Sequence, residues 1–227
     1  MLIDIHVHAA WPRHAKVARA TGSRYPTPER LIEMMDAHGI ARAALMCGVS
    51  PECRYTVVPP EETLSIAARY PDRLIPFANL DPRWVSNSPS ADFRGLLAAY
   101  KELGCKGLGE YTPNLPLDHP LNLNLFAQVE EAQLPLIFHL APHEGGYYGC
   151  VDEVGLPRLE RVLRAFPKLT LLGHSQPFWA EISTDVLREG RRVSYPEGPV
   201  TPGRVIELMR RYPNLCGDLS AQSGLNA

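Results

Sequence analysis

Short apolar runs alternate with amphipathic segments along the whole of this chain. The apolar runs have the length of strands, and many are apolar at successive positions, as in parallel strands that are covered on both faces. The segments between them carry apolar residues at helical spacing. One begins at Thr27-Pro28-Glu29, with Pro in the first turn, and ends before Gly39. The other predicted helices are 59–70, 91–103, 121–133, 156–166 and 202–212, and the predicted strands are 1–5, 41–49, 74–80, 105–111, 136–140, 169–174 and 215–220.

One predicted helix leads to each strand after the first, with a new strand about every 30 to 40 residues. This alternation predicts parallel βαβ units. A (β/α)8 barrel of the TIM type fits better than a doubly wound sheet, because no Gly-x-Gly-x-x-Gly turn follows the first strand. Polar residues also follow several strands at their carboxyl ends, and in a barrel those ends converge on one mouth.

Seven strands are predicted, one fewer than a barrel of this type needs. Such barrels usually contain about 250 residues, whereas this chain has 227. We therefore expect one domain, 1–227, that lacks strand eight because the chain is a C-terminally incomplete version of a longer protein. A swapped or partner-supplied strand is the alternative, since proteins rarely leave strand edges unpaired.

The first strand ends in Asp4-Ile5-His6-Val7-His8. Residues i and i+2 of a strand point to the same face, so His6 and His8 project side by side. Two imidazoles so placed can bind one metal ion. Two surface histidines are the alternative, but the chain has only eight His in 227 residues, which favours a metal-binding pair.

Three later strands end in further candidate ligands, Glu110, His139 and His174. Together with His6 and His8 they form a donor set that suits Zn²⁺, with Mn²⁺ as the second possibility. Such a metal polarises a carbonyl and lowers the pKa of its water to about 7. The alternatives are buried histidines hydrogen-bonded to backbone, and a loop or helix-capping carboxylate at position 110.

Asp218 interrupts an otherwise apolar strand, in Cys216-Gly217-Asp218-Leu219-Ser220. Burying this carboxylate without a partner would be costly. It therefore either pairs with a neighbouring His or Arg or takes part in catalysis.

Other polar residues near the predicted mouth are less decisive. His143 and Glu144 follow the fifth strand and either touch a substrate or belong to a polar loop. Arg13, Lys16 and Arg19 could hold a substrate carboxylate, and a basic loop with no such role is the alternative. Surface positions are expected for His14, His38 and His119, and packing or rim positions for Trp11, Trp84 and Trp179.

The composition narrows the choice of partner. The formal charge is -2 and the pI is about 6.4, with no long run of one sign, so neither nucleic acid nor a membrane surface is expected and a small-molecule substrate is. Five cysteines without Cys-x-x-Cys argue against a disulfide framework and a zinc finger, and Cys47, Cys105 and Cys216 are expected in the core. Without a leader or an apolar run of about 20 residues, a cytoplasmic protein is expected.

The set of strand-end motifs resembles the amidohydrolase superfamily, and more closely its amidohydrolase-related branch, which includes aminocarboxymuconate-semialdehyde decarboxylase-like proteins. The resemblance spans the chain and rests on Ile3-Asp4-Ile5-His6-Val7-His8, Phe77-Ala78-Asn79-Leu80-Asp81-Pro82, Leu108-Gly109-Glu110, Leu136-Ile137-Phe138-His139, Leu172-Gly173-His174 and Gly217-Asp218-Leu219-Ser220.

The resemblance implies roles for these residues. It implies that His6, His8 and His139 bind metal and that His174 binds a second metal, activates water or protonates substrate. Glu110 matches the position at which TatD-type nucleases use a bridging carboxylate. Asp218 matches the strand-seven Asp-Leu-Ser, whereas the family's strand-eight aspartate has no counterpart here. A homodimer is also implied.

Three functions compete at this stage. The first is a metal-dependent hydrolase, in which metal-activated water attacks an amide, ester or lactone carbonyl. The second is a metal-dependent non-oxidative decarboxylase on the same scaffold, with His174 delivering a proton to carbon. The third is an inactive barrel used for binding, which the four strand-end histidines disfavour because unused buried imidazoles are costly.

Overall fold

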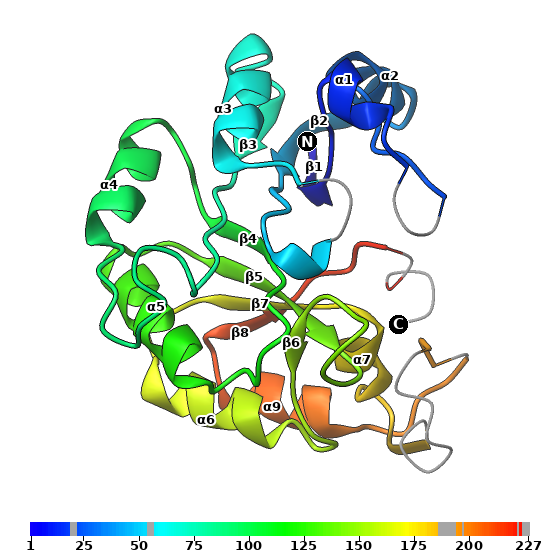
Figure 1. The fold of residues 1–227 in the computed structure, drawn as a ribbon. Helices are drawn as coiled ribbons and strands as arrows, with labels where there is room; N and C mark the ends of the chain where they lie inside the picture. The colour runs from blue at the N-terminus through cyan, green and yellow to red at the C-terminus, as the bar shows by residue number, and fades with distance from the viewer. Residues whose placement is uncertain (19–21, 54–56, 186–193, 197, 222, 224–227) are drawn as a thin grey trace.

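The computed structural model describes residues 1–227 except 19–21, 54–56, 186–193, 197, 222 and 224–227 (Figure 1). Its strands are β1 Leu2–Val7, β2 Ile40–Leu45, β3 Leu74–Pro76, β4 Leu108–Tyr111, β5 Leu136–Ala141, β6 Cys150–Val151, β7 Leu171–His174 and β8 Leu215–Gly217. Its helices are α1 Pro12–Ala15, α2 Pro28–Ala37, α3 Pro60–Arg69, α4 Arg94–Glu102, α5 Pro120–Glu131, α6 Pro157–Ala165, α7 Gln176–Ala180 and α9 Arg204–Arg211, with a 3₁₀ turn at Pro51–Cys53.

The expected alternation of helix and parallel strand is confirmed. Strands β1, β2 and β3 form one parallel sheet, and β4, β5, β7 and β8 follow one another in a second. Backbone bonds join the two sheets, since Ala78 N donates to Gly107 O at 3.0 Å and Gly109 N donates to Ala78 O at 2.8 Å. The seven predicted strands therefore succeed one another as in a TIM-type barrel. The two-residue strand β6, which pairs with β5, was not predicted.

No pairing joins β1 to β8 within the described parts of the chain. A groove of about 490 Å³ lies between them and is lined by Leu2, Ile3 and Leu219. These three side chains are 57%, 40% and 56% exposed, which is unusual for apolar residues in or beside barrel strands. The described residues thus show the barrel strands from β1 to β8, but not the pairing between β1 and β8 that would close the barrel.

Helices α2, α3, α5 and α6 begin within one residue of the predicted positions, whereas α4 and α9 begin two or three residues later and α1 and α7 were not predicted. The Thr27 hydroxyl accepts from Arg30 N at 3.3 Å and caps α2, and a proline occupies the first turn of α2, α3, α5 and α6. His119 was expected at the solvated surface, but this is wrong in part. Its Nδ1 accepts from Leu121 N at 3.2 Å and caps α5, so the side chain is half-buried and structural.

The main hydrophobic core lies between the second sheet and four helices, α4, α5, α6 and α9. These helices lie along the outer side of that sheet (Figure 1). Phe126 of α5 is fully buried there, with its ring centroid 5.4 Å from that of Tyr111. Cys47 and Cys105 are buried as predicted and free of disulfides. Cys216 is exposed, so its predicted core position is wrong. Cys216 pairs in register with Leu172, which packs with Ala44, Met46 and Ile137, so it faces the inner side of the sheet, at a strand whose far edge has no partner among the described residues.

Among the described residues, no helix has the length and apolar character needed to span a bilayer.

We expect Phe126→Ala to lower the free energy of unfolding by about 3–5 kcal/mol, because the substitution leaves a cavity among fully buried side chains. Denaturant unfolding followed by circular dichroism measures the change. Leu96→Ala, on the outer face of α4 at 37% exposure, is the matched control and should change the value by at most about 0.5 kcal/mol. Equal losses in the two variants would contradict this core assignment.

Candidate functional site

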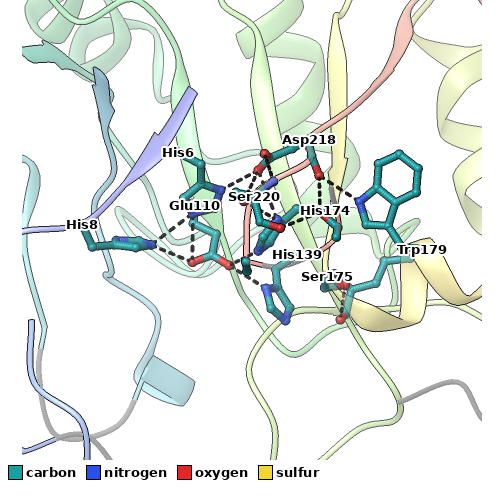
Figure 2. Close-up of polar contacts among 12 residues, drawn as sticks. His6, His8, Glu110, His139, His174, Ser175, Trp179, Asp218 and Ser220 are labelled. Carbon is teal, nitrogen blue, oxygen red and sulfur yellow. Dashed lines mark hydrogen bonds and ion pairs between the residues drawn. The ribbon is translucent and has the colours of Figure 1, made fainter. Parts of the chain in front are cut away.

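Five strands bring polar side chains to one end of the barrel. His6 comes from β1, Glu110 from β4, His139 from β5 and His174 from β7, while Asp218 directly follows β8. His8 lies just beyond the end of β1. Figure 2 shows these side chains converging on Glu110 from both sides, as expected when parallel strands present their carboxyl ends to the same mouth.

Three ligand atoms form a small triangle at the left of this cluster (Figure 2). His6 Nε2 lies 3.1 Å from His8 Nε2 and 3.8 Å from Glu110 Oε2, and His8 Nε2 lies 3.4 Å from the same oxygen. The predicted convergence of His6 and His8 at the end of β1 is thus seen. The three atoms form a candidate metal site made of two imidazoles and a carboxylate.

The carboxylate of Glu110 also faces the other two histidines. Its Oε1 lies 2.6 Å from His139 Nδ1 and 3.6 Å from His174 Nε2. The side-chain amide of buried Asn79, within the Phe77–Pro82 motif, donates to the Glu110 carbonyl and so fixes the backbone here. Glu110, His139 and His174 form a second group whose ligand atoms lie within 4.8 Å of one another.

Asp218 is fully buried and pairs with two histidines, as one of its predicted alternatives required. Its Oδ2 lies 2.6 Å from His6 Nδ1 and 3.1 Å from His174 Nδ1. A carboxylate that accepts from Nδ1–H leaves Nε2 of the same ring free to act as an acceptor or metal ligand. Asp218 therefore sets the orientation of both rings toward Glu110.

The charges in the cluster are strongly coupled. Burial lowers the pKa of His6, but hydrogen bonds with Asp218 and Glu110 outweigh it and raise this pKa to about 10. Burial raises the pKa of Glu110, yet the surrounding histidines, His139 first, hold it well below its usual range. The pKa of His139 is lowered because burial disfavours its charged form. The two carboxylates thus hold positive charge at His6.

Glycines allow this close approach of backbone and side chains. Gly149 has a φ of +110°, and a Cβ there would lie 2.6 Å from His139 Cδ2 and 2.9 Å from His139 O. Gly109, which precedes Glu110, would place a Cβ 3.0 Å from Ile137 Cβ. Side chains at either position would displace a member of the cluster or its support.

Several residues at the site were not singled out from the sequence. Ser220 Oγ lies 3.1 Å from His174 Nδ1 and donates to Asp218 Oδ2 at 3.0 Å. The ring of Tyr25 lies 5.4 Å from that of His8, and the ring of Tyr148 lies 4.5 Å from that of His139. Ser220 belongs to the strand-seven motif, but the two tyrosines lie in loops whose paths carry no periodic signal.

The other candidates lie away from the cluster. His143 and Glu144 are exposed, and His143 Nδ1 bonds with the Glu144 carbonyl. Arg13 and Lys16 are exposed in and beside α1, while Arg19 lies outside the described residues. His38 is exposed as predicted.

The tryptophans divide as expected into packing and rim residues. Trp179 is buried at 5% exposure, and its Nε1 donates to Asp218 O at 2.8 Å. Trp84 is 36% exposed. Trp179 therefore supports the backbone that carries Asp218.

Several solved structures share this fold. An uncharacterised TIM-barrel protein from Bordetella bronchiseptica has a TM-score of 0.63 at 17% identity, over 95% of this chain and 74% of that one. A 5-carboxyvanillate decarboxylase from Novosphingobium aromaticivorans, complexed with manganese and 4-hydroxy-3-methoxy-5-nitrobenzoic acid, has a TM-score of 0.56 at 19% identity, over 96% of this chain and 78% of that one.

A third similar structure is that of a probable 2-pyrone-4,6-dicarboxylic acid hydrolase from Acinetobacter baumannii with citric acid bound. Its TM-score is 0.54 at 17% identity, over 84% of this chain. This chain spans 64% of that hydrolase, less than two thirds of its length. At these identities the likeness establishes the TIM-barrel fold.

Sequence comparison gives the family. No curated protein sequence matches this chain. A family model described as Amidohydrolase matches residues 3–225, nearly all of the chain, and confirms the resemblance carried by the strand-end motifs. The chain therefore belongs to the amidohydrolase family.

Proposed function

We propose that this protein is a metal-dependent hydrolase that acts on the amide, ester or lactone carbonyl of a small molecule. The observation that carries the proposal is the triangle of His6 Nε2, His8 Nε2 and Glu110 Oε2. Two ligands, each about 2.1 Å from a zinc ion and at a tetrahedral angle, lie about 3.4 Å apart. The triangle has edges of 3.1, 3.4 and 3.8 Å and so has the right size before any ion enters.

The donor types also suit a divalent cation. Imidazole and carboxylate together favour Zn²⁺, and Mn²⁺ is the second candidate. His139 shares Glu110 with the triangle, so it is proposed as a further ligand, whereas Nε2 of His174 is assigned to proton transfer. When bound, such a cation supplies Lewis-acid polarisation of a carbonyl and a lower pKa for water.

His174 is proposed to move the proton during hydrolysis. Its Nδ1 is held by Asp218 Oδ2 and Ser220 Oγ, both at 3.1 Å, while its Nε2 faces Glu110. Asp218 would stabilise the imidazolium that forms when the ring accepts a proton, and would keep the ring in place when it returns that proton to the leaving group. Asp218 therefore acts in catalysis through His174.

Decarboxylation is the second candidate, and the same ring supports it. A histidine held by a carboxylate at Nδ1 can deliver a proton to carbon as well as to a leaving group. Against it, the ion pairs that the described residues form within the cluster join histidines to carboxylates, and none of them includes an Arg or Lys. Hydrolysis is therefore the first choice.

We expect the double variant His6→Ala/His8→Ala to retain less than about a tenth of the bound zinc or manganese, because two donors of the triangle are removed. Elemental analysis by plasma mass spectrometry after dialysis measures the metal content. The matched control is His38→Ala/His143→Ala, which removes two exposed histidines outside the cluster. Metal content that falls equally in both variants, or in neither, would refute the site.

Metal affinity should rise with pH. The pKa of His6 is raised to about 10, so over the neutral range the ring is charged and both of its nitrogens carry a proton. The proton on Nε2 must leave before that atom can bind a cation. Calorimetric titration with zinc or manganese at about pH 6, 7 and 8 should give affinities that increase at each step, with protons released to the buffer. An affinity independent of pH would show that His6 does not take part.

Metal-loaded protein should hydrolyse members of a panel of small esters, lactones and amides. His174→Gln should lower kcat by about 10²- to 10⁴-fold, because it removes the proton carrier. Ser220→Ala, which removes only one hydrogen bond to that ring, should retain most of the activity. Release of carbon dioxide from aromatic or unsaturated acids, without hydrolysis, would assign the second candidate function instead.

A further inference from the structure

A second concave site lies at the opposite end of the strands from the histidines. It is a groove of about 340 Å³ between α3, the end of α4 and strand β3, which lie together at the left and top of Figure 1. Arg42, near the start of β2, and Lys106, just before β4, also line it. Its volume is at the lower end of the range for small-ligand pockets, which begins at about 300 Å³.

The charges in this groove are all positive. Its lining contains Arg42 and Lys106 and no acidic residue. The neighbouring Arg73, in comparison, has acceptors for its guanidinium. It donates to Ala41 O at 2.9 Å and to Asp36 Oδ1 at 2.6 Å. By contrast, Arg42 Nε is buried and has no hydrogen-bond acceptor among the described residues. The described residues therefore provide no carboxylate that offsets the charge of Arg42 within the groove.

The remaining walls are apolar. Leu64 of α3, Leu74 of β3 and Leu103 at the end of α4 line the groove, together with alanines, prolines and Ile75. An inorganic anion would gain nothing from these walls, whereas a molecule with a charged end and a hydrocarbon body would use both parts of the lining. Arg is well suited to the charged end, because its fork of donors matches a carboxylate.

We propose that this groove binds a small monocarboxylate with an apolar body, either an alkanoate or an aromatic acid. The carboxylate accepts from the guanidinium of Arg42 and lies within reach of Lys106, while the body packs against Leu64, Leu74 and Leu103. This site is separate from the histidine cluster and does not depend on the function proposed for that cluster.

Calorimetric titration with octanoate tests the proposal. Wild-type protein should bind octanoate, and Arg42→Met should weaken binding by at least about tenfold because the charge-assisted bonds are lost. Lys106→Met should weaken it less. Lys101→Met is the matched control, because Lys101 is an exposed cation of α4 outside the groove whose Nζ donates to Ala132 O at 2.7 Å. It should bind octanoate as wild type does.

Two further measurements keep the test decisive if Arg42→Met fails to fold. Methyl NMR of wild-type protein should show octanoate shifting the signals of Leu64 and Leu103. Octanamide, which lacks the charge, should bind at least about tenfold more weakly. Octanamide binding as tight as that of octanoate, shifts confined to the histidine cluster, or displacement by an equal concentration of inorganic phosphate would each overturn the proposal.

Discussion

Two buried carboxylates surrounded by four imidazoles are the arrangement on which the rest of this molecule depends. Glu110 and Asp218 are 8% and 0% exposed, and each would be costly to bury alone. Each is instead held between histidines that arrive from different strands. The attraction works in both directions, since the acids raise the pKa of His6 while the histidines lower that of Glu110. The strands can therefore end in buried acids and histidines, because the strand ends converge and these side chains pair with one another.

The barrel scaffold brings the carboxyl ends of the strands together and leaves their amino ends available for a second site. The carboxyl ends of parallel strands collect charge and open loops, while their amino ends are bounded by turns and helix ends. Here the carboxyl end carries the proposed cation site, and the groove beside Arg42 carries the proposed carboxylate site. The two proposals thus give one set of strands two sites of opposite charge preference.

Much of this organisation could be predicted from the sequence because its causes are local. The capping residue Thr27 and the first-turn prolines mark helix starts, and the apolar runs mark strands whose final residues must share one end. What the sequence leaves open depends on distant neighbours. Cys216 lies in an apolar run but is exposed, because β8 has no strand partner at its far edge among the described residues. The contacts of Tyr25 and Tyr148 depend on loop paths, and the pairing of Asp218 on a residue at the other end of the chain.

The bond between His6 and Asp218 joins residues 212 positions apart. Contacts of such long range form late, because most of the chain must be ordered before its ends can meet. The first strand therefore leaves the ribosome with its histidine pair before Asp218 has been made, and the orienting carboxylate follows 212 residues later. The proposed metal site would thus be complete only after folding has brought these distant residues together.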